Sequence, residues 1–226
     1  MYAQHGPDGM SQEAFRDYWR EHFEVSEETP GFWTHVRRYV QGDALNALPV
    51  DLGQSGQYHG VAEIYYDGLD ARNSALTAPG VAEKMVPHAL QFFGASPPVR
   101  LSGEETQFIA RQEDGVKAFT FFRRNPALDA GAFAAKLKQA GEALVGRAGV
   151  AALLTGYSQT IACEDGVYDA VDEIGCATIE DLEVVLKALA SNGVMRADQR
   201  DYADCDARLM VIVAPNLLFD GLAQAA

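Results

Sequence analysis

The chain has 226 residues, of which 48% are hydrophobic, and a formal net charge of −14 at pH 7. A phosphate backbone and an anionic bilayer would both repel such an acidic surface, so we expect no nucleic-acid partner and no membrane partner. The sequence contains no apolar run of 18 or more residues, and its start lacks the basic residues and apolar stretch of a secretion signal. The three cysteines have no metal-ligand spacing, which favours a reduced, cytoplasmic protein.

The first half of the chain predicts the order strand, helix, strand, strand, helix, strand, from its apolar periodicity and its turn residues. The predicted elements are a short strand at 1–5, a helix at 11–23, strands near 35–41 and 58–66, a helix at 69–92 with a break at Pro79-Gly80, and a strand near 104–111. The stretch 42–57 is rich in Gly, Asn and Gln and reads as a loop.

The second half predicts the same order of elements. It offers an apolar strand at 116–124, a helix at 129–144, strands at 150–162 and 168–177, a helix at 178–193, and a last strand at 207–214. Asp129 is a plausible N-cap of the first of these helices, and Gly193 suits the end of the second. Residues 110–115 would join the halves.

Individual residues recur between the halves as well. An offset of 118 places Tyr39 on Tyr157, and an offset of 110 places Glu63 on Glu173. The change of offset predicts an insertion of eight residues in the first half, near 42–57. Similar composition of two α/β segments is the alternative explanation. Because the order of elements also agrees, we interpret the chain as a tandem repeat.

The βαββαβ order predicts a four-stranded antiparallel sheet with two helices on one face, the ferredoxin-like arrangement. Each sheet then has one face without helices, and two copies in one chain can cover each other's bare faces. We therefore predict an α+β fold of two fused ferredoxin-like repeats that form an internal barrel. The expected domains are residues 1–111 and 115–214, followed by a C-terminal tail at 215–226.

Three stretches resemble the EthD family of dimeric α+β barrel proteins. "MSQEAFRDYWREHF" (10–23) resembles the family's opening helix, and "GVAEIYYDGLDARNSAL" (60–76) resembles its third strand and following helix. "ADQRDYAD" (197–204) resembles the late aspartate-rich turn before the last strand. The resemblance implies a tandem EthD-like pair over nearly the whole chain, folded as an internal dimeric-type α+β barrel.

The opening helix differs from the family pattern at one position. The family usually carries a histidine four residues after the tryptophan, followed by Ala-Pro, whereas this chain has Phe23 there and places His22 one residue earlier. The equivalent helix of the second half, 133–144, has no Tyr, Trp or His. All five histidines and both tryptophans lie in the first half, so we expect any site to be lined by the first repeat.

Within the opening helix, Phe15 and Trp19 are spaced i, i+4 and are predicted to face the core. Tyr18 and His22 share another face, which could reach a cavity. A lone histidine is more often a surface residue or a satisfied core residue, and this is the alternative for His22.

In the strand predicted at 58–66, side chains alternate, so His59, Glu63 and Tyr65 are expected on one face. A histidine, a carboxylate and a phenol could transfer protons if this face lines a cavity, and burial would raise the pKa of Glu63. The recurrence of Glu63 in the second half also fits a structural hydrogen bond in both repeats. Tyr39 either bonds a carbonyl or packs as an amphipathic side chain.

The sequence contains no phosphate-binding loop, dinucleotide fingerprint, nucleophile elbow or zinc-binding histidine pair, so we predict no cofactor and no metal. With the resemblance, the first hypothesis is a small cofactor-independent enzyme that acts on an apolar, oxygenated small molecule in a barrel cavity. The family implies dehydration, isomerisation, decarboxylation or oxidation. The candidate catalytic residues are His22, Tyr39, His59 and Glu63. The alternatives are a non-catalytic binder of a hydrophobic ligand and a filled barrel that acts only by contact. A homodimer is left open.

Overall fold

The computed structural model of the chain describes residues 1–45, 57–93, 97–191 and 201–221. The chain forms two compact units. The first unit comprises Met1–Ala44, Gln57–Val99 and Asn216–Ala226, and the second comprises Leu45–Gly56 and Arg100–Pro215. Each unit is an antiparallel sheet with helices on one face, so the α+β class and the two ferredoxin-like repeats are confirmed.

The first unit follows the predicted βαββαβ order. Its elements are β1 (Tyr2–Gln4), α1 (Gln12–Glu27), α2 (Pro30–Trp33), β2 (Val36–Ala44), β3 (Gly60–Tyr66), α3 (Leu69–Leu76), a π-helical turn (Val81–Met85), α4 (Val86–Phe93) and β4 (Val99–Arg100). The sheet order is β4-β1-β3-β2. The predicted break in the helix at 69–92 is confirmed, because Gly80 adopts a left-handed φ of 89° between α3 and the π-helical turn.

The second unit repeats this arrangement. Its elements are β5 (Gly103–Ile109), β6 (Val116–Arg124), α5 (Ala130–Val145), α6 (Ala148–Ala151), β7 (Leu154–Ala162), β8 (Ala170–Cys176), α7 (Ile179–Ser191) and β9 (Ala203–Asp220). The sheet order is β9-β6-β8-β7-β5. Asp129 caps α5 as predicted, because its side chain accepts a hydrogen bond from the backbone N–H of Ala132. Gly193, the predicted end of the last helix, lies outside the described residues.

Each unit also takes an edge strand from the chain segment that follows the other repeat. β5 follows the first repeat in sequence, yet it pairs antiparallel with β7 of the second unit from Gly103 to Ile109. β9 begins in the second unit beside β6, and its last residues belong to the first unit, next to β2. There the backbone N–H of Gly221 donates to the carbonyl of Arg37 at 2.8 Å. The last strand therefore extends six residues beyond its predicted end at 214.

Strand register confirms the internal repeat at the level of single residues. Tyr39 lies opposite Ile64 in the first unit, and Tyr157 lies opposite Ile174 in the second. The two pairs reproduce both sequence offsets, so the change of offset falls between β2 and β3. The predicted insertion at 42–57 spans this connection, most of which (46–56) lies outside the described residues.

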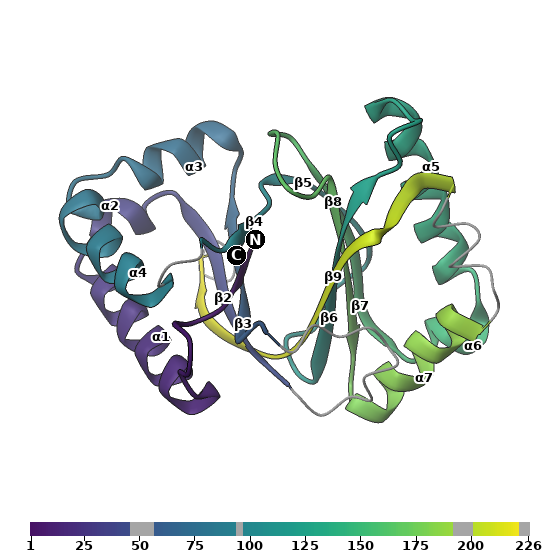
Figure 1. Ribbon diagram of the computed structural model, residues 1–226, viewed down its shortest axis with the longest axis horizontal. Coiled ribbons are helices and arrows are strands. Elements are labelled where there is room, and N and C mark those ends of the chain that lie inside the picture. Colours follow the sequence, from purple (N-terminus) through teal and green to yellow (C-terminus); the bar gives the residue numbers. More distant parts are fainter. Residues whose placement is uncertain (46–56, 94–96, 192–200, 222–226) are drawn as a thin grey trace. The chain divides into compact units, whose positions relative to one another are not determined.

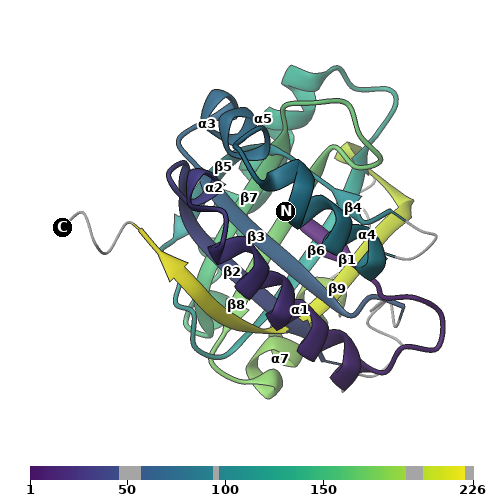
Figure 2. The ribbon, with the colours of Figure 1, turned by 90° about the vertical axis from the view of Figure 1, so that its left-hand side faces the viewer.

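The core of the first unit lies between its sheet and its helices. Figure 1 shows α1, α3 and α4 along one face of the sheet, and Figure 2 shows α1 crossing in front of β2 and β3. Phe15 and Trp19 of α1 are fully buried against this sheet face, as predicted. Gly60 allows the close approach of the helix, because a Cβ atom at this position would lie 2.4 Å from the Trp19 ring.

The second unit buries the matching face of its own sheet under α5, α6 and α7 (Figure 1). Phe133, Leu137 and Leu144 of α5 are buried at the spacing that the sequence predicted for one helix face. These three occupy the positions of α1 that face the core in the first unit, so the two repeats build their cores from equivalent positions.

Candidate functional site

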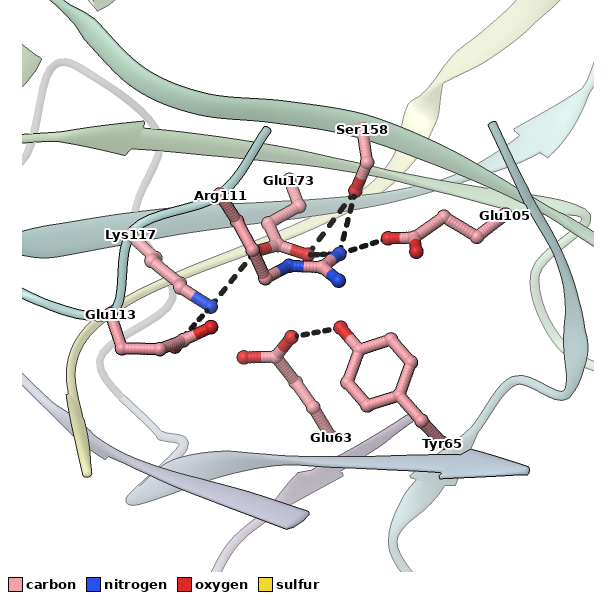
Figure 3. Close-up of polar contacts among 8 residues, drawn as sticks. All are labelled: Glu63, Tyr65, Glu105, Arg111, Glu113, Lys117, Ser158 and Glu173. Carbon is pink, nitrogen blue, oxygen red and sulfur yellow. Dashed lines mark hydrogen bonds and ion pairs between the residues drawn. The ribbon is translucent and has the colours of Figure 1, made fainter. Parts of the chain in front are cut away.

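Glu63 lies in the middle of β3, on the sheet face that carries no helix. Its strand neighbours Ala62 and Ile64 pack with Phe15 under α1, so alternation turns Glu63 the other way. The side chain is 1% exposed, and its Oε2 accepts a hydrogen bond from the hydroxyl of Tyr65 at 2.6 Å (Figure 3). Glu63 and Tyr65 thus share a face, as the sequence predicts.

His59 does not join them, contrary to the predicted alternation. Its ring stacks on Phe15 of α1 with 4.8 Å between ring centroids, and its Nδ1 accepts a hydrogen bond from the backbone N–H of Gly6 at 3.2 Å. Its Nε2 lies 3.2 Å from the carbonyl oxygen of Met10. β3 begins at Gly60, so the alternation of side chains does not reach residue 59. His59 instead holds the connection between β1 and α1.

His22 lies between helices. Its Nδ1 is 3.1 Å from Nδ1 of His88 on α4, and the His88 ring also stacks on Tyr18. Burial, reinforced by the neighbouring His88, lowers the pKa of His22 to about 4, so the ring is neutral at pH 7. The pair joins α1 to α4, away from Glu63 and His59.

The hydroxyl of Tyr39 belongs to a chain of hydrogen-bonded polar side chains. It projects from β2 toward the helices, is 6% exposed, and its hydroxyl oxygen accepts a hydrogen bond from Nε2 of Gln41 at 2.9 Å. Gln41 is held in turn by the guanidinium of Arg20, which also bonds Asp43 at 2.7 Å. Burial raises the pKa of Tyr39 to about 12, while the hydrogen bond from Gln41 opposes the rise. Tyr39 is therefore a neutral phenol at pH 7.

Aromatic rings surround this phenol. Phe23 stacks on Tyr39 with 5.8 Å between centroids, Trp33 lies 5.9 Å away, and Phe219 of β9 contacts Trp33 at 4.9 Å. We call Tyr39, Phe23, Trp33 and Phe219 the Tyr39 cluster. Phe23, at the position where the resemblance to the EthD family leads one to expect a histidine, therefore lies in this cluster, whereas His22 lies beside His88.

Gln41, Trp33 and Phe219 are not among the site residues predicted from the sequence. Gln41 recurs with Tyr39 as Gln159 with Tyr157, and this joint recurrence was a usable signal. Trp33 and Phe219 carried none, since one lies in the short helix α2 and the other in the stretch expected to be a tail.

The second repeat contains the same hydrogen-bonded pair of tyrosine and glutamine. Nε2 of Gln159 donates to the hydroxyl of Tyr157 at 2.8 Å, which repeats the bond between Gln41 and Tyr39. Opposite Gln159 lies the buried Asp172. Ala62 holds the equivalent place in the first repeat. The second repeat therefore has a carboxyl group opposite its glutamine, where the first repeat has a methyl group.

The space between α5 and Tyr157 is occupied by an aromatic ring. Gly141 occupies in α5 the place of Phe23 in α1, and a Cβ atom there would meet the ring of Phe108 at 2.6 Å. Phe108 comes from β5 and stacks on Tyr157 with 5.1 Å between centroids. The second repeat thus packs a ring of its own against the tyrosine.

Glu173, the equivalent of Glu63, lies in a buried ionic group. Its carboxylate is 2.9 Å from Nζ of Lys117 and 3.2 Å from a guanidinium nitrogen of Arg111, which also bonds Glu105 (Figure 3). Burial alone would raise the pKa of Glu173, but these two cations outweigh it and hold the pKa below its usual value. The same Lys117 binds Glu113 at 2.9 Å. This arrangement fits a structural role for the recurring glutamate in the second repeat.

Within the described part of the chain, no group of three or more His, Cys, Asp and Glu side chains is placed to hold a metal ion. Among the same residues, no helix has both the length and the apolar character that a membrane crossing requires.

Comparison with known proteins gives a family-model match over part of the chain and a fold for nearly all of it. Residues 7–96 match the family model described as the EthD domain. No curated protein matches the chain. A candidate monooxygenase from Lactobacillus acidophilus NCFM aligns with a TM-score of 0.58 at 11% identity, covering 97% of this chain and 94% of that one. A candidate monooxygenase from Fusobacterium nucleatum aligns with a TM-score of 0.60 at 8% identity, covering 96% and 91%. A chlorite dismutase variant from Candidatus Nitrospira defluvii aligns with a TM-score of 0.51 at 10% identity, covering 94% and 89%. At these identities the three structures establish the fold alone, that of the dimeric α+β barrel proteins.

Proposed function

We propose that this chain, whose residues 7–96 match the EthD domain family model, is a small enzyme that binds an apolar, oxygenated molecule at the Tyr39 cluster. The carbonyl oxygen of the ligand would accept a hydrogen bond from the hydroxyl of Tyr39. The rings of Phe23 and Trp33 would contact the apolar body of the ligand.

The polarity of the hydrogen bonds at Tyr39 carries this proposal. Gln41 bonds the hydroxyl oxygen of Tyr39 as a donor, so it does not accept the hydroxyl proton. The structure describes no acceptor for this proton among the residues it covers. A buried donor without an acceptor is costly, and a ligand oxygen would satisfy it.

A neutral phenol held in place suits reactions that develop negative charge on a carbonyl oxygen. Dehydration, isomerisation and decarboxylation next to a carbonyl all pass through enolate-like states. Because the pKa of Tyr39 lies near 12, the group keeps its proton at neutral pH and can donate to such an oxygen. The link from Asp43 through Arg20 and Gln41 fixes the phenol before the ligand arrives, which is the preorganisation that oxyanion stabilisation requires.

A non-catalytic ligand-binding protein is the second candidate, and one observation favours it. Phe23 replaces the family's usual histidine beside Tyr39, and a phenylalanine cannot move a proton. His22, His59 and Glu63 are placed elsewhere in the unit, between helices, at the start of α1 and on the opposite sheet face respectively.

Tyr39→Phe tests the proposal, with Tyr157→Phe as its matched control in the second repeat. We propose screening aromatic ketones, 1,3-diketones and lactones for turnover by mass spectrometry and for binding by isothermal titration. Y39F should lower kcat by about 10²–10³-fold and weaken binding by about three- to tenfold, as for loss of one donor. Y157F should change neither value more than about twofold. Binding without turnover would establish the second candidate, and equal binding by wild type and Y39F would refute the proposed site.

A further inference from the structure

Tyr66 places a second buried hydroxyl on the face of β3 that the helices cover. Its side chain packs against the core of the first unit together with Ala62 and Ile64 of the same strand. Its hydroxyl oxygen is buried and has no hydrogen-bond partner among the residues that the structure describes. Most buried polar groups in native proteins are paired, and a bound water or ligand accounts for many of the exceptions. The hydroxyl of Tyr66 is therefore a donor in need of an oxygen that the described residues do not supply.

Strand register places this second phenol beside the first. Tyr39 lies opposite Ile64, and Tyr66 follows Ile64 by two residues. Side chains at such diagonal positions share a sheet face and lie about 7–8 Å apart, within reach of aromatic side chains. Burial raises the pKa of Tyr66 above its usual value, and the nearby phenols of Tyr2 and Tyr39 add to the rise. Tyr66, like Tyr39, is therefore a neutral donor at pH 7.

The second repeat has no counterpart of this donor. Val36 pairs with Tyr66 in the first unit, and Leu154 pairs with Cys176 in the second, so the register makes Tyr66 and Cys176 equivalent. Cys176 is fully buried, whereas Tyr66 and the three rings that surround Tyr39 are only partly buried. Solvent thus reaches the ring layer around the two phenols of the first unit. The first repeat alone combines two phenol donors with such access.

We propose that the hydroxyl of Tyr66 is the second hydrogen-bond donor to the ligand, beside Tyr39, and that the ligand is an aromatic 1,3-dicarbonyl compound. This inference rests on the proposed function and names its substrate class. Loss of a proton from the carbon between two carbonyl groups gives an enolate whose charge is shared by both oxygens. Two neutral donors then stabilise one anion, with one oxygen at Tyr39 and the other at Tyr66. A ligand with a single carbonyl leaves one of the two hydroxyl groups without an acceptor.

Tyr66→Phe and Tyr65→Phe form a matched pair of variants in one strand. Tyr65 lies on the opposite sheet face, where its hydroxyl donates to Glu63 at 2.6 Å. In urea denaturation without ligand, Y65F should lower the midpoint because Glu63 loses its donor, whereas Y66F should leave the midpoint unchanged or raise it. A midpoint lowered as far by Y66F as by Y65F would overturn the inference, and so would a Y66F chain that does not fold. Either result would mean that the hydroxyl of Tyr66 has a partner within the protein.

Two probes with one naphthalene body measure the role of Tyr66 in binding. They are 1-(2-naphthyl)butane-1,3-dione, which has two oxygens, and 2-acetylnaphthalene, which has one. Titration calorimetry at pH 7.5 gives their dissociation constants for wild type, Y39F, Y65F and Y66F. Wild type and Y65F should bind the diketone about three- to tenfold more tightly than the ketone. Y66F should weaken the diketone by this factor and the ketone by less than about twofold, and Y39F should weaken both.

The two probes also separate this inference from the proposed function. A Y66F variant that weakens both probes equally, or that leaves the diketone unaffected, would overturn the inference. If Y39F still weakens both probes in that case, the proposed function stands. No binding of either probe would overturn the inference, and equal binding by wild type and Y39F would overturn the proposed function as well.

Discussion

Replacing Asp172 by asparagine should stabilise the chain at alkaline pH. The carboxyl is buried beside Tyr157 and Gln159, and burial raises its pKa from 3.8 to about 7 although both hydrogen bonds oppose the rise. The folded state therefore holds this proton to a higher pH than the unfolded state does. The contribution of this carboxyl to the free energy of unfolding is full below pH 3.8. It falls as the pH rises from 3.8 to about 7 and is lost above about pH 7.

The size of the effect follows from the shift. About three pH units at 1.36 kcal/mol each give a loss of about 4 kcal/mol when the carboxyl is fully ionised. Between pH 5 and pH 8 the free energy of unfolding of the wild type should fall by about 3 kcal/mol through this group alone. Asp172→Asn carries no charge at either pH, so its stability should lack this component.

Urea denaturation at pH 5, 6, 7 and 8 measures the difference between wild type and D172N. The exposed Asp165 supplies the control, and D165N should follow the wild-type pH dependence. A D172N variant with the pH slope of the wild type, or one less stable than the wild type at pH 8, would refute the reasoning. Either result would mean that Asp172 is ionised in the folded state without penalty.

Three further stability predictions follow from buried groups. Lys117→Met should lower the free energy of unfolding, measured by urea denaturation, by about 3–5 kcal/mol, because it removes a cation from the buried Glu173. The control K187M breaks a surface pair with Glu183 and should lower it by less than about 1 kcal/mol. For His22, whose pKa falls from 6.5 to about 4 on folding, stability is full above pH 6.5 and is lost as the pH falls toward 4. Between pH 7 and pH 5 the free energy of unfolding of the wild type should therefore fall by about 2 kcal/mol more than that of H22Q. Equal decreases in the two proteins would contradict the burial of His22. Trp19→Ala should cost about 3–5 kcal/mol by the same assay, and a cost under about 1 kcal/mol would contradict the packing of Trp19 in the core.

Local patterns predicted the repeat well, because they are set by short-range physics. The alternation of β3 placed Glu63 and Tyr65 on one face, and the i, i+4 spacing of α1 placed Phe15 and Trp19 in the core. The recurrence of Tyr39 as Tyr157 predicted a register that the strand pairing reproduces. The patterns of β3 and α1 repeat every second and every fourth residue, and the recurrence of Tyr39 follows from the similarity of the two halves.

Features that depend on distant parts of the chain were not predictable in this way. The pairing of β5 with β7, and the extension of β9 into the first unit, depend on which edge of a sheet is free, and no local pattern records this. His59 was misplaced because a shift of one residue in the start of a strand reverses the direction of a side chain. Phe219 was missed because it enters the Tyr39 cluster through the exchanged end of β9.

The exchange explains why the candidate site differs from the predicted one. In each unit, the strand that comes from outside the repeat brings an aromatic ring near the tyrosine. Phe219 of β9 contacts Trp33, which lies beside Tyr39. Phe108 of β5 stacks directly on Tyr157. The two repeats also differ at core positions near the tyrosine. They are Ala62 against Asp172, and Phe23 against Gly141.

A crystal structure of the chain with an aromatic 1,3-diketone such as 1-(2-naphthyl)butane-1,3-dione tests ligand binding at Tyr39 most directly. We predict a bound diketone with an oxygen about 2.5–2.9 Å from the hydroxyl oxygen of Tyr39 and the naphthalene ring against Phe23 and Trp33. A probe bound on the helix-free sheet face beside Glu63, with Tyr39 untouched, would contradict it.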